Sequence, residues 1–195
     1  MEHNRWARLV TEVLAPWVWV LFLPLVVAWR VTGHVGQTLL WGLVVGVTGS
    51  VIPMAIIVRG ARAGRWDGHH VTNRAGRLVP FLACISSLGG GAALLIVGGA
   101  PWPMIALAAS MFATLVVALA VTFGARWKVS MHTAVSGGAV IILMATYNLW
   151  LVLLAPLVGL IGWSRVSLKD HTRAQVAVGA ALGAVAGGVL YWVLL

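Results

Sequence analysis

Two short polar segments, residues 128–132 and 164–173, interrupt the apolar second half of the chain. Each combines a histidine, His132 or His171, with at least one lysine or arginine. Cationic side chains bind the oxygens of a phosphoryl group, while one imidazole can attack phosphorus and a second can protonate the leaving group. These residue types therefore predict chemistry on a phosphoryl group.

The later segment has the more specific spacing. Arg165 ends one predicted helix and His171 begins the next, and Gln175 follows His171 by four residues, on the same helix face. The amide oxygen of Gln175 can accept a hydrogen bond from one imidazole nitrogen, which fixes the tautomer and leaves the other nitrogen able to attack. The alternative for His171 is an interfacial histidine that only tolerates lipid headgroups.

The earlier segment is predicted to start a helix. Ser130 and His132 lie at this start, where free backbone N–H groups and the helix dipole favour an anion. Lys128 adds a full positive charge. The alternative is a serine that caps the helix beside an incidental histidine.

A third polar segment precedes the third apolar stretch. Its Arg74 and Arg77 are candidate phosphate ligands, although arginines in such loops are often only topology signals. Asp67 can orient an arginine or pair with a histidine. His69 and His70 are adjacent and so cannot easily bind one ion from a regular element, and we expect no metal site.

Composition places these segments at the ends of membrane-spanning helices. Of the 195 residues, 61% are hydrophobic and 9% are charged, and the mean hydropathy is +1.00. No soluble domain of this size buries so much apolar surface. We therefore predict an all-α, multi-pass transmembrane bundle that forms one domain over residues 1–195. The first apolar stretch lacks a small-residue cleavage site, so we expect a retained helix rather than a signal peptide.

A span needs about twenty apolar residues. The chain offers seven candidates, at about 14–31, 37–58, 79–98, 103–124, 131–147, 149–164 and 174–195. The break near residue 147 is the least distinct, and one tilted helix over 131–164 would reduce the count to six. Glycines recur every four residues from Gly179 to Gly187, which permits close contact with a neighbouring helix. The single cysteine, Cys84, is expected to be a small buried hydrophobic residue.

The basic residues segregate strongly under the seven-span prediction. Twelve of the 13 lysines and arginines fall on one side, and only Arg30 lies near the other. Such a bias marks the cytoplasmic side, so we expect a site that faces the cytoplasm in the cell membrane. The net charge is +9, with four carboxylates. Anionic lipid headgroups, a phosphorylated substrate and topology explain this charge better than nucleic acid does.

The later segment resembles the third motif of the type 2 phosphatidic acid phosphatase superfamily, also called lipid phosphate phosphatases. That motif reads Ser-Arg, five residues, His, three residues and Asp. The chain has Ser164-Arg165, five residues, His171, three residues and Gln175. The motif therefore matches up to its last position.

The other two motifs of the superfamily match less fully. The second is Pro-Ser-Gly-His, and residues 129–132 read Val-Ser-Met-His. The first is Lys, six residues and Arg-Pro, and here Asp67, six residues and Arg74-Ala75 stand at that spacing. Lys128 is placed to replace the missing first-motif Lys. The order of motifs and helices is also similar, and the chain looks like a divergent prokaryotic branch.

The resemblance implies a hydrolase that needs no metal or other cofactor. It makes His171 the nucleophile that forms a phosphohistidine, and His132 the group that protonates the leaving oxygen and later assists water. Gln175 would hold His171 without the negative charge of the usual Asp, and Asp67 could supply that charge instead. The expected ligands of the phosphoryl oxygens are Arg74, Lys128, Ser130 and Arg165, with Arg77 as a further candidate.

The expected substrate is a lipid phosphate, or an isoprenyl phosphate or diphosphate, because the site lies at a membrane interface between apolar helices. Membrane lipids are the other expected partners. A non-catalytic lipid-phosphate binder or carrier is the alternative, motivated by the missing Lys and by Gln175. A small transporter is disfavoured because we find no ionisable residue near a predicted mid-span, and Arg30 lies at the end of a predicted span. Metal-dependent prenyl and alcohol phosphotransferases need more carboxylates than the chain has.

Overall fold

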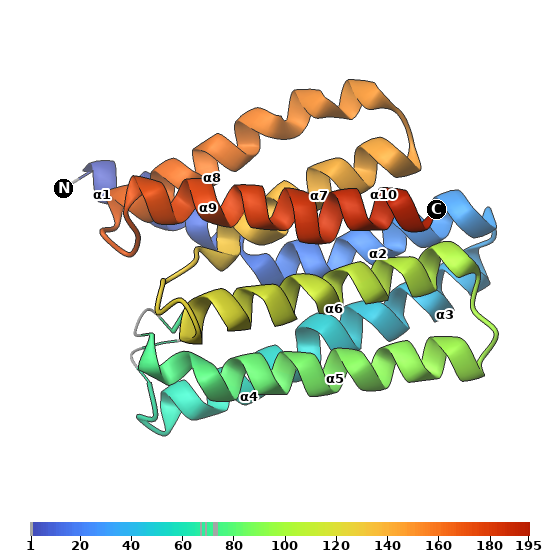
Figure 1. Ribbon diagram of the computed structural model, residues 1–195, viewed down its shortest axis with the longest axis horizontal. Coiled ribbons are helices and arrows are strands. Elements are labelled where there is room, and N and C mark those ends of the chain that lie inside the picture. The colour runs from blue at the N-terminus through green and yellow to red at the C-terminus, as the bar shows by residue number, and fades with distance from the viewer. Residues whose placement is uncertain (1, 67, 69, 72–73) are drawn as a thin grey trace.

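The computed structural model describes residues 2–66, 68, 70–71 and 74–195, and these residues form a bundle of helices (Figure 1). Six helical stretches among them are long and apolar enough to cross a membrane: Arg5–Thr32, Val35–Arg62, Leu78–Val97, Trp102–Phe123, Leu149–Ser167 and Arg173–Leu194. A seventh apolar helix, Met131–Thr146, is shorter. The prediction of an all-α bundle with six to seven spans is confirmed.

Several of the long stretches are built from more than one helical segment. The first contains α1 (Glu2–Val13) and α2 (Pro16–Thr32). The second contains α3 (Val35–Gly46), the wide π-helical turn η1 (Val47–Val51) and α4 (Ile52–Arg62). A short 3₁₀ turn, η2 (Ala75–Arg77), leads into α5 (Leu78–Val97), which is followed by α6 (Trp102–Phe123) and α7 (Met131–Thr146). The last two stretches contain η3 (Leu149–Leu154) with α8 (Ala155–Ser167), and α9 (Arg173–Leu182) with the π-helical turn η4 (Gly183–Val189) and α10 (Leu190–Leu194).

Local sequence explains where the helices break. Pro16 starts α2 at a position where the missing N–H costs nothing, and Gly33 ends it in the left-handed conformation, with φ of 59°. The chain also breaks after α7, where Tyr147 and an extended Asn148 separate it from η3. Residues 131–164 are therefore two helices rather than one tilted helix.

The short helix α7 lies at the centre of the bundle, packed against α2, α8, α9 and η4. Its 16 residues are about 24 Å long, less than the roughly 30 Å of a bilayer core. The chain reaches α7 by running into the bundle, because Val129 and Ser130 are fully buried. The first turn of α7 is consequently buried, although it lies near one end of the molecule.

Glycines bring α7 against the last long helix. A Cβ on Gly179 would lie 2.6 Å from the carbonyl oxygen of Ser130, and one on Gly183 would collide with the carbonyl of Ala134. Only glycine permits such backbone contact between helices. The predicted close contact is thus confirmed, and it brings the start of α7 beside the start of α9.

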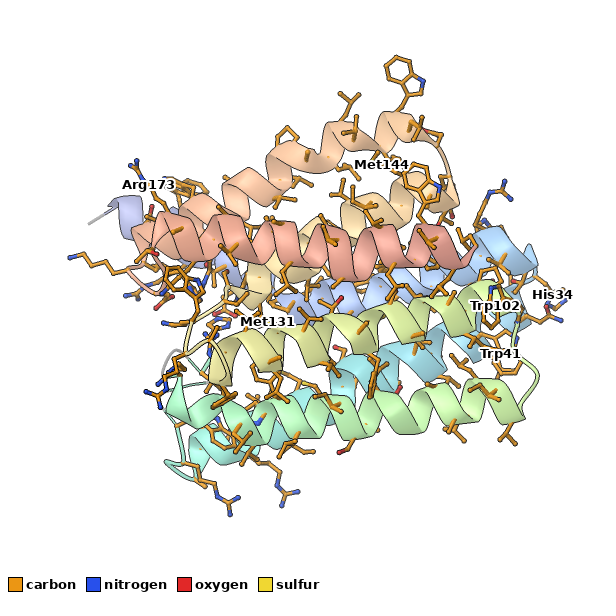
Figure 2. The ribbon with its side chains drawn as sticks, in the orientation of Figure 1. His34, Trp41, Trp102, Met131, Met144 and Arg173 are labelled. Carbon is orange, nitrogen blue, oxygen red and sulfur yellow. The ribbon has the colours of Figure 1, made fainter. Side chains whose placement is uncertain are left out.

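The polar connections gather at one end of the bundle. In Figure 1 the start of α1, the end of α4, the start of α5, the connection between α6 and α7, and the α8–α9 turn all lie at the left end. The opposite end carries the turns near Gly33 and Gly99 and the C-terminus. Figure 2 shows Arg173 among the side chains of the left end, and His34, Trp41 and Trp102 at the other. The segments predicted to carry chemistry therefore share one end of the fold.

Candidate functional site

His171 is held by the first turn of α9. Thr172 caps this helix: its hydroxyl accepts a hydrogen bond from the backbone N–H of Gln175 at 3.3 Å. In return, Oε1 of Gln175 accepts from the backbone N–H of Thr172 at 3.2 Å and lies 3.1 Å from Nδ1 of His171. An atom that accepts from a backbone N–H is the amide oxygen, so Nδ1 of His171 donates to it and carries the proton. The unprotonated nitrogen of the neutral ring is Nε2, as an attacking group requires.

The surroundings keep His171 neutral. Burial lowers its pKa to about 3. Three nearby cations act in the same direction: Arg77, Lys128 and Arg165. The hydrogen bond with Gln175 acts in the opposite direction. At neutral pH the ring is therefore uncharged and is surrounded by positive charges. A bound anion would reduce the repulsion between these cations.

The first turn of α7 contributes His132 and Ser130. Ser130 is fully buried and His132 is 5% exposed. Ser130 Oγ and His132 Nε2 have no hydrogen-bond partner among the described residues. Ser130 stands at the N-cap position, yet its side chain makes no cap bond. A buried polar atom without a partner is costly and calls for an explanation such as a polar ligand. Of these two side chains, His132 lines the cavity described below, whereas Ser130 is not among its lining residues.

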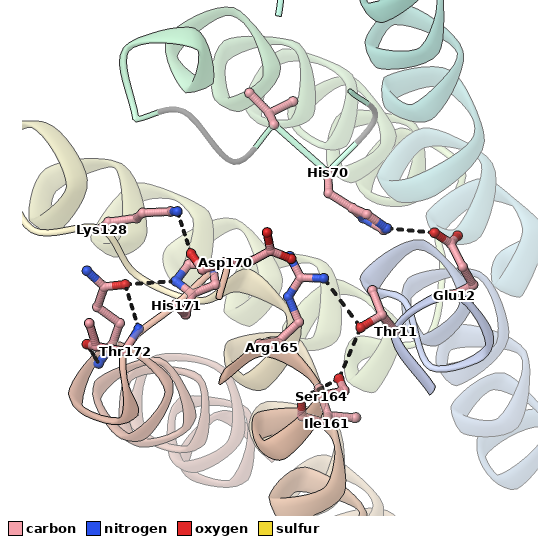
Figure 3. Close-up of polar contacts among 12 residues, drawn as sticks. Thr11, Glu12, His70, Lys128, Ile161, Ser164, Arg165, Asp170, His171 and Thr172 are labelled. Atoms are coloured by element: carbon pink, nitrogen blue, oxygen red, sulfur yellow. Dashed lines mark hydrogen bonds and ion pairs between the residues drawn. The ribbon is translucent and has the colours of Figure 1, made fainter. Parts of the chain in front are cut away.

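Arg165 is the most buried charged side chain at the site, with 1% exposure. Its Nη2 lies 2.8 Å from Oδ2 of Asp170, and its Nη1 donates to Oγ1 of Thr11 at 3.4 Å (Figure 3). Its Nε has no partner among the described residues. Thr11 also shares a 3.0 Å hydrogen bond with Ser164. The N-terminal helix α1 thus reaches the end of α8 and completes the surroundings of this guanidinium group.

A second contact of α1 involves a histidine pair. Nε2 of His70 lies 2.9 Å from Oε1 of Glu12 (Figure 3). The ring of His70 packs edge-on against the ring of His132, with centroids 5.0 Å apart and an angle of 62° between the planes. Glu12 therefore pairs with His70, the ring of His70 contacts that of His132, and both rings line the cavity described below.

The remaining predicted cations have different positions. Arg77 is 6% exposed and donates to the carbonyl oxygens of Val71 and Val129 at 2.9 and 2.8 Å. Lys128 donates to the carbonyl oxygen of Asp170 at 2.5 Å, which ties the loop before α7 to the α8–α9 turn. Arg74 is half-buried and is not among the described residues that line the cavity below.

The predicted role of Asp67 concerns a residue outside the part of the chain that the structure describes. The nearby carboxylates seen among the described residues are Glu12 and Asp170, and neither was predicted to have a role at the site. Within the described residues, no three His, Cys, Asp or Glu side chains are grouped so as to hold a metal ion.

One cavity of about 210 Å³ unites the site. Its polar end is lined by two arginines and three histidines from five segments: His70, Arg77, His132, Arg165 and His171. The rest of its wall is almost entirely apolar. Two imidazoles with predicted chemical roles therefore line the same cavity, together with two guanidinium groups that can bind an oxyanion.

Sequence reasoning missed the contributions of α1. Thr11 and Glu12 precede the first predicted span and carry no motif. The available signal was the scarcity of carboxylates, since Glu12 is one of only four in the chain. Comparisons of the chain with known protein families, with curated proteins and with solved structures find no match.

Proposed function

We propose that this protein is a metal-independent membrane phosphatase, which hydrolyses a lipid or isoprenyl phosphate or diphosphate through a phosphohistidine. The observation that carries the proposal is the shared cavity, where His132 and His171 meet Arg77 and Arg165. A net positive, buried and partly unpartnered polar end is suited to a phosphoryl group. The apolar remainder of the cavity is suited to the hydrocarbon part of an amphiphile.

In the first step, Nε2 of His171 attacks phosphorus while Gln175 holds the Nδ1 proton. The bond from phosphorus to the leaving oxygen breaks, and its electron pair stays on that oxygen. His132 enters this step as an imidazolium and donates a proton to this oxygen. The leaving group therefore departs as an alcohol or a protonated phosphate rather than as the corresponding anion. Arg77 and Arg165 neutralise the charge on the oxygens that remain on phosphorus.

In the second step, a water molecule attacks the phosphohistidine. His132 takes one proton from the water as its oxygen bonds to phosphorus. The nitrogen–phosphorus bond breaks and returns its electron pair to Nε2 of His171, and inorganic phosphate leaves. His132 carries a positive charge during part of this cycle, and the carboxylate of Glu12 balances any charge on the neighbouring ring of His70, with which it pairs.

The second candidate function is a non-catalytic binder or carrier of lipid phosphates. It is favoured by Gln175, since an amide oxygen can orient His171 but cannot stabilise the imidazolium as a carboxylate does. The same polar cavity would then hold the phosphate without attack on phosphorus.

Phosphate release from detergent-solubilised protein separates the two candidates. A panel of glycerolipid and isoprenyl phosphates and diphosphates is assayed in the presence of a metal chelator, with the parent, His171→Ala and His34→Ala. His34 is an exposed histidine at the opposite end of the bundle and makes a matched control. We expect turnover by the parent and His34→Ala and its loss in His171→Ala. Binding without turnover on any member of the panel would favour the carrier, and full activity of His171→Ala would refute the assigned nucleophile.

A further inference from the structure

The cavity continues from the polar end deep into the bundle. One face of α7 lines it from His132 to Ile142. Ten residues of helix correspond to about 15 Å, roughly half the thickness of a bilayer core. On α5, Cys84 and Leu88 line the same space, about 10 and 16 Å along the helix from Arg77.

The two π-helical turns of the fold both border this deep part. η1 contributes Gly49 and Ser50, and η4 contributes Gly187. A π-helical turn is wider than an α-helical one and occurs frequently at functional sites. The hydroxyl of Ser50 donates to the carbonyl oxygen of Trp17 at 2.8 Å, so it is satisfied within the protein and does not call for a polar ligand. The hydroxyl of Thr114 is likewise satisfied, by the carbonyl oxygen of Ser110 at 2.9 Å. The wall away from the polar end is consequently mostly apolar, although it includes Trp19, whose buried indole N–H has no hydrogen-bond partner among the described residues.

We propose that this deep part binds one hydrocarbon chain of the phosphorylated substrate inside the helix bundle, and so selects single-chain alkyl or isoprenyl phosphates by chain length. The inference rests on the proposed function for the position of the phosphate. The arginines and histidines fix the charged head at one end, and the apolar wall extends from it in one direction. A cavity of about 210 Å³ favours one chain over the two chains of a diacyl lipid.

Chain length should therefore control the specificity constant. Each methylene moved from water into the cavity contributes about 0.8 kcal/mol, or about fourfold in kcat/KM. The increase should continue while the chain fills the cavity and should stop when the chain reaches its end. Longer chains then gain nothing further from the protein.

Two variants on α5 test the depth of the site. Cys84→Phe and Leu88→Phe put an aromatic ring into the cavity at the two depths given above. Ser86→Phe makes a similar change at an exposed position of the same helix and is the control. The assay measures kcat/KM for butyl, octyl, dodecyl and hexadecyl phosphate, together with a diacyl phosphate. We expect the gain with length to stop earliest in Cys84→Phe, later in Leu88→Phe, and at the parental length in Ser86→Phe.

Binding of the matching alkyl phosphonates, which cannot be hydrolysed, keeps this inference separate from the proposed function. Length-dependent thermal stabilisation by phosphonates, lost in Cys84→Phe and kept in Ser86→Phe, supports the chain site even where no phosphate is released. Three outcomes overturn the chain site and leave the phosphatase proposal standing. They are turnover that does not depend on chain length, the same dependence of kcat/KM on chain length in the two variants and the control, and a preference for the diacyl substrate. If both α5 variants fail to fold, the parental series alone decides, because a flat length dependence contradicts the site.

Discussion

The ion pair between Arg165 and Asp170 gives the sharpest prediction about stability. Arg165 is 1% exposed and Asp170 is 23% exposed, with 2.8 Å between their charged atoms. Asp170→Asn keeps the shape of the side chain and removes its charge. The guanidinium group is then a buried cation without its counterion, and breaking a buried pair in this way costs about 3–5 kcal/mol. Because Asp170 is partly exposed, we expect a loss of about 3 kcal/mol, the lower end of that range.

Thermal unfolding in detergent, followed by tryptophan fluorescence, measures this loss. At about 2–4 °C per kcal/mol for a chain of this size, the melting temperature should fall by about 6–12 °C. Inorganic phosphate should restore much of it, since a ligand at 100 times its dissociation constant stabilises by about 2.7 kcal/mol. The gain should be larger in Asp170→Asn than in the parent, where the carboxylate competes with phosphate for Arg165.

A double variant provides the control. Arg165→Met combined with Asp170→Asn removes both charges of this pair and should be more stable than Asp170→Asn alone. Two results would refute the proposal that Arg165 binds the anionic group of the substrate. One is an unchanged melting temperature in Asp170→Asn, and the other is equal stabilisation of the parent and Asp170→Asn by phosphate.

Three further changes probe the histidines. Gln175→Glu keeps the helix cap and adds a carboxylate beside His171, so the pKa of His171 should rise from about 3. The acid limb of the pH profile of kcat/KM should therefore move to higher pH. An unchanged acid limb would contradict the contact between residue 175 and His171. Glu12→Gln should lower kcat on alkyl phosphates by about tenfold or more with little change in KM. It should leave kcat on p-nitrophenyl phosphate unchanged, because that leaving group needs no proton. Equal losses of kcat on both substrates would argue against a role of Glu12 through His70 and His132. Finally, His171 should contribute stability that is full above pH 6.5, where an unfolded histidine is neutral, and that is lost as the pH falls towards its folded pKa of about 3. The melting temperature of His171→Gln should accordingly fall less between these pH values than that of the parent.

The membrane-spanning helices were predictable because hydropathy acts locally along the chain. The contact between Gln175 and His171 was also predictable, since it depends only on the spacing of residues at one helix start. The glycines from Gly179 to Gly187 marked a helix face that accepts close contact, and the structure shows α7 on that face.

The contribution of α1 was not predictable in the same way. Thr11 and Ser164 are 153 residues apart in sequence, and no periodic pattern connects them. Their contact depends on how the first helix crosses the end of α8, which is a property of packing rather than of either segment. The same limit applies to Arg74 and Arg77, because motif spacing favoured the former whereas the loop path puts the latter in the cavity. Asp170 was visible as a rare carboxylate, yet its role depends on the fold of the turn that returns it to Arg165.

Direct capture of the covalent intermediate tests the central claim. The parent protein is mixed with a radiolabelled isoprenyl phosphate, quenched within a turnover under alkaline conditions that preserve phosphohistidine, and mapped by mass spectrometry. The account predicts phosphate on His171 of the parent and none at this position in His171→Ala. With a substrate whose leaving group needs no proton, a larger fraction of His132→Ala than of the parent should carry the label. Turnover with phosphate on another residue would contradict it. So would turnover without labelled protein in both the parent and His132→Ala.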